Sequence, residues 1–366
     1  MEYNPFVRGP HPVGVFTLSV RHESLADRPV AVELWYPARR SYRGRDLDDR
    51  TRDEFTIAPG LPMTSQRAVR DAEAEPGERP LFLYLHGGYG HRREMTHLST
   101  HLASHGYVVA APDFPGDNIA DLVPRDGVEA AVTKAPIDES ARNRPRQASL
   151  LLDLVLAAAI PNGLSVSAGR IGTGGMSMGG FTALAINSRD RRVAAVFAMC
   201  PMCGTRSLSP QVRRLDGLLR TDDWARPVST FVLTGELDPL VNVQDVRLLY
   251  DTLRTPKHLA VLGKGGHMHF ADGAQAIHEG FRRGYLSGAF SDPELQGSDG
   301  VRLGEAMRPF SELCTEEQAG DTARALCLAH MDANLKDDVE ARSFLDADLV
   351  KTFAVRGIDL DVMSRR

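Results

Sequence analysis

The stretch RIGTGGMSMGGFTAL, residues 170–184, constrains the fold of this chain more than any other segment. An apolar, β-like run precedes Ser177, a helix-compatible run follows it, and residues 175–179 fit the pattern G-x-S-x-G. A serine in such a strand-to-helix turn takes strained backbone angles, and its neighbours two before and two after must lack a Cβ to avoid a clash. The stretch therefore predicts a sharp turn that lifts the Ser177 hydroxyl above the edge of a sheet. A glycine-rich packing turn is the alternative interpretation.

The rest of the sequence alternates between strand-like and helix-like segments. Residues 13–20 and 28–37 predict an antiparallel hairpin, because both are rich in β-formers and a polar stretch separates them. Apolar strands are expected at residues 80–86, 107–113, 170–176, 192–200, 229–235 and 257–263, and helices at residues 94–106, 144–159, 178–188 and 243–254. Strands that are apolar throughout suit a parallel sheet covered by helices on both faces. The polar, arginine-rich residues 39–79 predict an exposed excursion.

Length and charge limit the classes of protein to which this chain can belong. With 366 residues, 42% of them hydrophobic, the chain can bury a large core, and we expect one domain over residues 1–366. The net charge is −5 and the basic residues are scattered, which argues against a nucleic-acid partner. No apolar run approaches the roughly 20 residues that span a bilayer, and the N-terminal residues do not follow the pattern of a signal peptide. We therefore expect a cytoplasmic protein without a membrane span.

A serine hydroxyl is a poor nucleophile without a base and an orienting acid, and both occur further along the chain. The segment STFVLTGELDPLV ends an apolar strand in a loop with Glu236 and Asp238, and AVLGKGGHMHF does the same with His267 and His269. We prefer Asp238, because the G-x-x-D-P spacing puts the shorter carboxylate past the strand end. We prefer His267, because the flexible GKGG loop before it can aim the ring. The predicted catalytic residues are Ser177, Asp238 and His267.

Two backbone N–H groups are expected to stabilise a developing oxyanion. One belongs to Met178, at the N-terminus of the helix that follows the serine. The other is expected in LYLHGGYGHRR, residues 83–93, where glycines let the backbone turn its N–H groups inwards. We favour Gly88 as this donor, with Tyr89 as the alternative. His86 is interpreted as a structural loop residue.

The cysteines and histidines do not form a recognisable metal site. Cys200 and Cys203 have a C-x-x-C spacing, but a second such pair is missing, so we expect reduced thiols. Cys314 and Cys327 would form a disulfide only in an exported protein. The HMH stretch at residues 267–269 has no acidic or histidine partner at ligand spacing. The sequence therefore predicts neither a metal nor a cofactor.

The sequence resembles one branch of the α/β-hydrolases in several motifs. These are HGG, GMSMGG, GELDP and GGHMHF, together with GPHPVGVFTLSV and RPVAVELWYPA near the start. That branch holds platelet-activating-factor acetylhydrolase-like enzymes, predicted dienelactone hydrolases and bacterial polyester hydrolases. The resemblance runs from about residue 9 to residue 354. It implies the α/β-hydrolase fold, an α/β class with a mostly parallel central sheet, helices on both faces and an N-terminal antiparallel hairpin. Cap or lid insertions are expected at about residues 117–140 and 270–320.

The expected function is that of a cofactor-free serine esterase. True dienelactone hydrolases use a cysteine nucleophile, whereas this sequence has Ser177 at that position. The expected partner is a small-molecule ester, cleaved through an acyl-enzyme. An amidase or a carbon–carbon bond hydrolase with the same residues remains open, as does a non-catalytic ligand-binding homologue. A thiol redox protein based on Cys200 and Cys203 is the remaining alternative.

Overall fold

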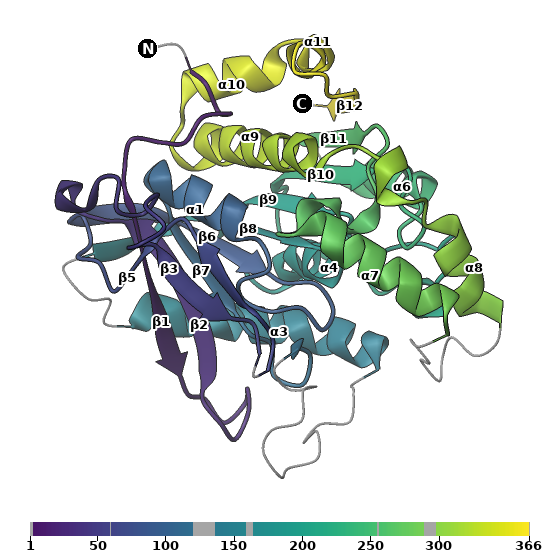
Figure 1. Cartoon of the computed structure of the whole chain (residues 1–366), viewed down its shortest axis with the longest axis horizontal. Coiled ribbons are helices and arrows are strands. Elements are labelled where there is room, and N and C mark those ends of the chain that lie inside the picture. The colour runs from purple at the N-terminus through teal and green to yellow at the C-terminus, as the bar shows by residue number, and fades with distance from the viewer. Residues whose placement is uncertain are drawn as a thin grey trace.

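The computed structural model describes residues 3–58, 60–119, 136–158, 164–254, 256–288 and 298–365. Within them, a ten-stranded sheet has the strand order β12-β11-β10-β9-β8-β6-β7-β2-β1-β5, and β3 and β4 form a separate hairpin (Figure 1). The strands are β1 (Val13–Val20), β2 (Val30–Pro37), β3 (Asp53–Thr56), β4 (Met63–Gln66), β5 (Val69–Arg70), β6 (Gly77–Leu85), β7 (Val108–Pro112), β8 (Leu164–Met176), β9 (Val193–Met199), β10 (Ser229–Gly235), β11 (Lys257–Leu262) and β12 (Leu360–Arg365).

The centre of the sheet is parallel. Strands β7, β6, β8, β9, β10 and β11 pair in parallel with one another. At one end β12 pairs antiparallel with β11, and at the other the antiparallel hairpin of β1 and β2 joins the sheet through an antiparallel pairing with β7. Strands β6 and β9 to β11 are buried along most of their length, as expected for strands covered on both faces. The predicted fold class is therefore confirmed. Strands β5 and β12 extend the sheet beyond the predicted strands.

Helices cover both faces of the sheet. They are α1 (Thr96–Ser104), α3 (Ile137–Ala157), α4 (Met178–Ala185), α5 (Pro210–Arg213), α6 (Val243–Thr252), α7 (Ala274–Leu286), α8 (Ser298–Ala306), α9 (Glu316–Leu335), α10 (Val339–Asp346) and α11 (Leu349–Ala354), with a 3-10 turn η4 (His267–Phe270) after β11. In Figure 1, α1 and α9 lie on one side of the sheet and α3 and α4 on the other. Among the helices that the structure describes, none is long and apolar enough to cross a membrane.

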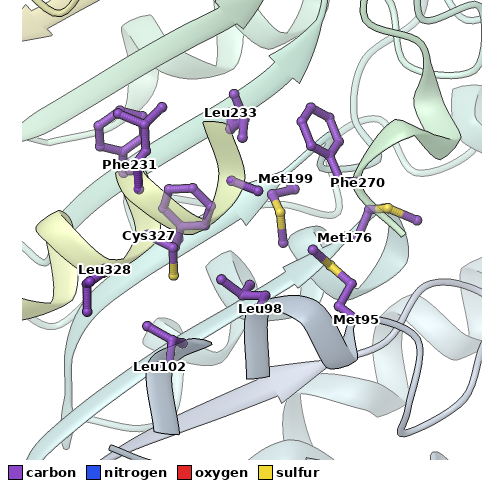
Figure 2. Close-up of a cluster of buried hydrophobic side chains, with 14 of the residues drawn as sticks. Met95, Leu98, Leu102, Met176, Met199, Phe231, Leu233, Phe270, Cys327 and Leu328 are labelled. Atoms are coloured by element: carbon purple, nitrogen blue, oxygen red, sulfur yellow. The ribbon is translucent and has the colours of Figure 1, made fainter. Parts of the chain in front are cut away.

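Each face of the sheet has its own apolar core. Under α1 and α9, a cluster that includes Leu98, Phe231 and Cys327 also holds the side chain of Met176 (Figure 2). On the other face, the cluster under α3 and α4 holds the side chain of Met178. The two neighbours of Ser177 are thus anchored in opposite cores. Residues two positions apart in a regular strand would share one face, so the sharp turn at Ser177 is what sends these two side chains to opposite sides. This anchoring fixes the position of Ser177 at the edge of the sheet.

The structure describes the two expected insertions only in part. Of the first insertion, residues 120–135 lie outside the described part, and of the second, residues 289–297 do. The excursion at residues 39–79 is only partly as predicted. It contains the β3–β4 hairpin and strand β5. The half-buried Arg70 of β5 pairs with Glu33 Oε1 at 2.8 Å and with Asp53 Oδ2 at 2.7 Å, which ties this segment to the sheet.

Candidate active site

Ser177 occupies the turn between β8 and α4. Its φ of 59° and ψ of −118° are strained for a residue with a side chain. Its N–H donates to Met199 O at 2.9 Å. A Cβ added at Gly175 or Gly179 would lie 2.2 or 1.8 Å from Leu85 O, so neither position has room for a side chain. The glycine pattern therefore has the steric cause predicted from the sequence.

Ser177 and the residues predicted as its base and acid lie together. His267 Nε2 is 2.9 Å from Ser177 Oγ, and His267 Nδ1 is 2.6 Å from Asp238 Oδ2. The other oxygen of Asp238 accepts the N–H groups of Leu240 and Val241, both at 2.8 Å. All three side chains are buried. An Nδ1–H bonded to Asp238 leaves Nε2 free to accept the Ser177 proton.

The alternative acid and base lie elsewhere in the same loops. Glu236 is exposed, and its Oε2 accepts the N–H of Lys264 at 3.0 Å. His269 Nδ1 accepts the N–H of Gly266 at 3.1 Å, and its ring stacks on Phe310 with centroids 4.7 Å apart. Burial lowers the pKa of His269 to about 4. Both residues stabilise the loop that carries His267.

The predicted oxyanion donors lie beside Ser177. A Cβ built at Gly88 would be 3.8 Å from Met178 Cβ, so these two residues are neighbours. Within the described part of the chain, no acceptor is found for the N–H of Gly88 or of Met178. The N–H of Tyr89, in contrast, donates to Asp117 Oδ1 at 2.8 Å. The geometry therefore favours Gly88 over Tyr89.

The four cysteines are free and buried, so Cys314 and Cys327 do not form a disulfide. Burial raises the pKa of Cys200, Cys203 and Cys327 above that of an ordinary thiol, and it raises the pKa of Cys314 to about 11. These shifts disfavour the thiolate that redox exchange requires.

Cys200 lies beside the proposed acid and base. Among the residues that the structure describes, one group of Cys, His and carboxylate atoms is compact enough to hold a metal ion, namely Cys200, Asp238 and His267, within 4.8 Å of one another. In this group, His267 Nδ1 and Asp238 Oδ2 already bond to each other. The HMH stretch considered in the sequence analysis does not bring His269 into the group.

Three polar residues near this site were not singled out as functional from the sequence. Glu94 Oε2 accepts the N–H of Gly87 at 2.9 Å, and loss of hydration raises the pKa of this carboxyl. Asp117 holds the N–H of Tyr89. Arg144, a charged residue within an amphipathic helical pattern, would be assigned to a solvated face, yet it is buried.

Comparisons with known proteins agree with this architecture. The model of the Dienelactone hydrolase family matches residues 69–272, a range that includes Ser177, Asp238 and His267. No curated protein sequence matches the chain significantly. Among solved structures, a ferulic acid esterase from Streptomyces cinnamoneus is similar to this chain, with 21% sequence identity and a TM-score of 0.61. The match covers 90% of this chain and 92% of the esterase, and at this identity it shows the fold.

Proposed function

The chain belongs to the dienelactone hydrolase family of α/β-hydrolases, and from this premise we propose that it is a serine esterase that cleaves small-molecule carboxylic esters. The observation that carries the proposal is the hydrogen-bonded series Ser177, His267, Asp238, with distances of 2.9 and 2.6 Å. The family is one of hydrolases. The name of the similar structure, a ferulic acid esterase, favours an ester as the substrate.

In the proposed first half-reaction, His267 Nε2 accepts the Ser177 proton while Oγ attacks the ester carbonyl. Asp238 keeps the proton of His267 on Nδ1 and stabilises the imidazolium that forms. The carbonyl oxygen becomes negative and accepts the N–H groups of Gly88 and Met178. The tetrahedral intermediate then collapses, and His267 gives its proton to the leaving alcohol. The acyl group remains on Ser177.

The second half-reaction uses the same groups. His267 takes a proton from a water molecule, and the resulting hydroxide attacks the acyl-enzyme carbonyl. The same two N–H groups stabilise the second oxyanion. Collapse returns the proton to Ser177 Oγ and releases the carboxylic acid. The ester and this water molecule are the only reactants that the balance requires besides the groups of the chain.

An organophosphonate tests the proposal, since its adduct mimics the tetrahedral intermediate. We expect the label on Ser177, with loss of p-nitrophenyl ester hydrolysis in proportion to occupancy. The Ser177→Ala variant, which removes only the hydroxyl group, is the control and should remain unlabelled. Peptide mass mapping decides the outcome: full inhibition with an unmodified Ser177 would refute the serine mechanism. Hydrolysis that a thiol alkylator abolishes would favour a cysteine enzyme instead.

Two matched substitutions, Asp238→Asn and Glu236→Gln, test which residue is the acid of the triad, because each replaces a carboxylate by an amide of the same length. The asparagine removes the charge that fixes the His267 tautomer, which costs about 10⁴ in turnover in a serine protease. Glu236→Gln keeps an acceptor for the Lys264 N–H, so turnover should stay within about threefold of the wild type. Steady-state kinetics on one p-nitrophenyl ester measures both. The opposite order of effects would assign the acid to Glu236.

A further inference from the structure

Arg144 of α3 lies under the loop of residues 86–90, which we call the oxyanion loop. Its side chain is 1% exposed. Nη1 donates to His86 O at 2.6 Å, and Nη2 donates to Gly87 O at 3.0 Å and to Asp117 O at 3.1 Å. Nε is 2.7 Å from Asp117 Oδ2, and the guanidinium lies over the Phe114 ring, 4.4 Å from its centroid. Nη2 also lies 3.2 Å from His86 Nδ1. Three of the contacts of this charge are therefore with backbone carbonyl groups.

The tautomer of His86 follows from its two neighbours. The N–H of Phe114 donates to His86 Nε2 at 3.0 Å, so Nε2 is unprotonated and the ring proton is on Nδ1. Nδ1 is 2.7 Å from Gly87 O and donates to it. Burial and the charge of Arg144 lower the pKa of His86, which keeps the ring neutral. Gly87 O thus accepts from His86 and Arg144, and also from the N–H of Gly90 at 3.2 Å.

The bond to Gly87 O sets the direction of the Gly88 N–H. A trans peptide unit is planar, and its C=O and N–H point in opposite directions. Because Arg144 holds the carbonyl of the Gly87–Gly88 peptide, the N–H of Gly88 points away from Arg144. A Cβ built at Gly87 would be 3.7 Å from Ser177 Cβ, so this peptide borders the serine. The neighbouring N–H groups of Gly87 and Tyr89 are held by Glu94 and Asp117.

We propose that Arg144 is a positioning residue for the oxyanion hole: its guanidinium fixes the Gly87–Gly88 peptide so that the Gly88 N–H faces the reacting carbonyl. The positive charge on the carbonyl side also polarises this peptide, and hydrogen bonds in such a series strengthen one another. Arg144 touches neither the substrate nor Ser177. The inference rests on the proposed function, because it concerns a donor that matters only when an oxyanion forms.

The loss of kcat expected on substitution of Arg144 has an upper bound. Loss of one oxyanion donor costs about 10²–10³ in kcat, because the interaction is made in the transition state. Arg144→Lys keeps the charge but cannot bond both carbonyls in the same plane, and Arg144→Gln removes the charge. We expect kcat to fall about tenfold in the first variant and 10²-fold or more in the second. KM should change by less than about threefold, since the planar ester carbonyl binds the hole weakly.

A trifluoromethyl ketone gives a readout that a merely structural role would not change. Ser177 adds to it and forms a hemiketal whose oxyanion needs the same N–H donors. Across wild type, Arg144→Lys and Arg144→Gln, its inhibition constant should rise in proportion to the fall in kcat/KM. Titration with the organophosphonate counts the reactive sites, so kcat is expressed per folded molecule.

Arg8 provides the matched control. Its Nη2 pairs with the buried Asp46 and donates to Arg67 O, on a part of the chain that does not contact Ser177. Arg8→Lys should lower the melting temperature while kcat and the inhibition constant stay within about twofold.

The outcomes separate this inference from the proposed function. Wild-type labelling of Ser177 with unchanged kcat in folded Arg144 variants would overturn the role of Arg144 alone. A fall in kcat without weaker ketone inhibition would overturn it too. Absence of label on wild-type Ser177 would refute the serine mechanism itself. If Arg144→Gln does not fold, Arg144→Lys carries the test, because it preserves the charge that Asp117 pairs with.

Discussion

The turn at Ser177 and the oxyanion loop face each other across the candidate site, and each contains glycines, but they are held in place differently. At the turn, a Cβ on Gly179 would lie 1.8 Å from Leu85 O, and Ser177 itself has a φ of 59°. The oxyanion loop also has a residue with positive φ, Tyr89 at 56°, but a Cβ on its Gly88 would make an ordinary contact, 3.5 Å from Ile137 Cδ1. The turn is held by steric crowding of the backbone, and the loop by polar side chains.

The difference shows that the same residue type can be present for two reasons. Glycine at position 179 makes the backbone fit against β6. Glycine at position 88 meets no such obstacle. Arg144, Glu94 and Asp117 determine where its loop lies. Steric crowding acts between atoms in contact and tolerates no substitution, whereas a loop held by several hydrogen bonds loses its geometry by degrees.

The largest effect should come from Ser177→Gly, which separates the strain at the turn from the chemistry. Removal of the nucleophile costs about 10⁶ in kcat in a serine protease, so hydrolysis should be abolished. The protein should become more stable by about 1–3 kcal/mol, because glycine adopts positive φ without strain. Thermal unfolding measures this gain, and Ser177→Ala is the control, since alanine keeps the strain. A melting temperature of Ser177→Gly no higher than that of Ser177→Ala would contradict a strained turn.

Gly179→Ala and Gly88→Ala test the two roles of glycine directly. The first places a methyl group inside the backbone of β6, and overpacking of this kind costs 1–3 kcal/mol or more. Because the clash is with backbone, we expect a cost of about 3 kcal/mol or more, which for 366 residues lowers the melting temperature by about 4 °C or more, with most of the activity lost. Gly88→Ala should stay within about 2 °C of the wild type and lose less than about tenfold in kcat. Equal destabilisation by both variants would remove the distinction drawn between the turn and the loop.

The smallest effect is expected at His269, which holds the His267 loop much as Arg144 holds the oxyanion loop. His269→Asn keeps an acceptor for the Gly266 N–H, so kcat should stay within about threefold at pH 7. The pKa of His269 is about 4 in the folded protein against 6.5 ordinarily, so the unfolded chain binds more protons between these values. This residue therefore lowers stability as the pH falls from 6.5 towards 4, and His269→Asn removes that loss. Thermal unfolding at pH 7 and pH 5 measures this effect. The melting temperature of the variant relative to that of the wild type should be higher at pH 5 than at pH 7.

Much of the fold and the candidate site was accessible from the sequence because the relevant signals are local. The apolar runs that became the parallel strands and the helices between them are patterns within a few residues. The glycines around Ser177 are required by contacts of the turn itself. The order of Ser177, Asp238 and His267, each in a loop after an apolar strand, placed them at one edge of the sheet. Strand β12 was missed because its pairing with β11 joins residues about a hundred positions apart.

By itself, the sequence determined the strand-to-helix turn at Ser177, the parallel sheet and the loops that carry the predicted acid and base. Only the tertiary structure showed that Asp238, and not Glu236, bonds to His267. It also showed that Asp117 holds the N–H of Tyr89, whereas the N–H of Gly88 has no acceptor among the described residues. It alone brought Arg144 to a carbonyl 57 positions away in the chain. Steric limits and periodicity depend on neighbouring residues and can be read along the chain. Hydrogen-bond partners depend on distances and directions of a few ångströms, which exist only after the elements have packed.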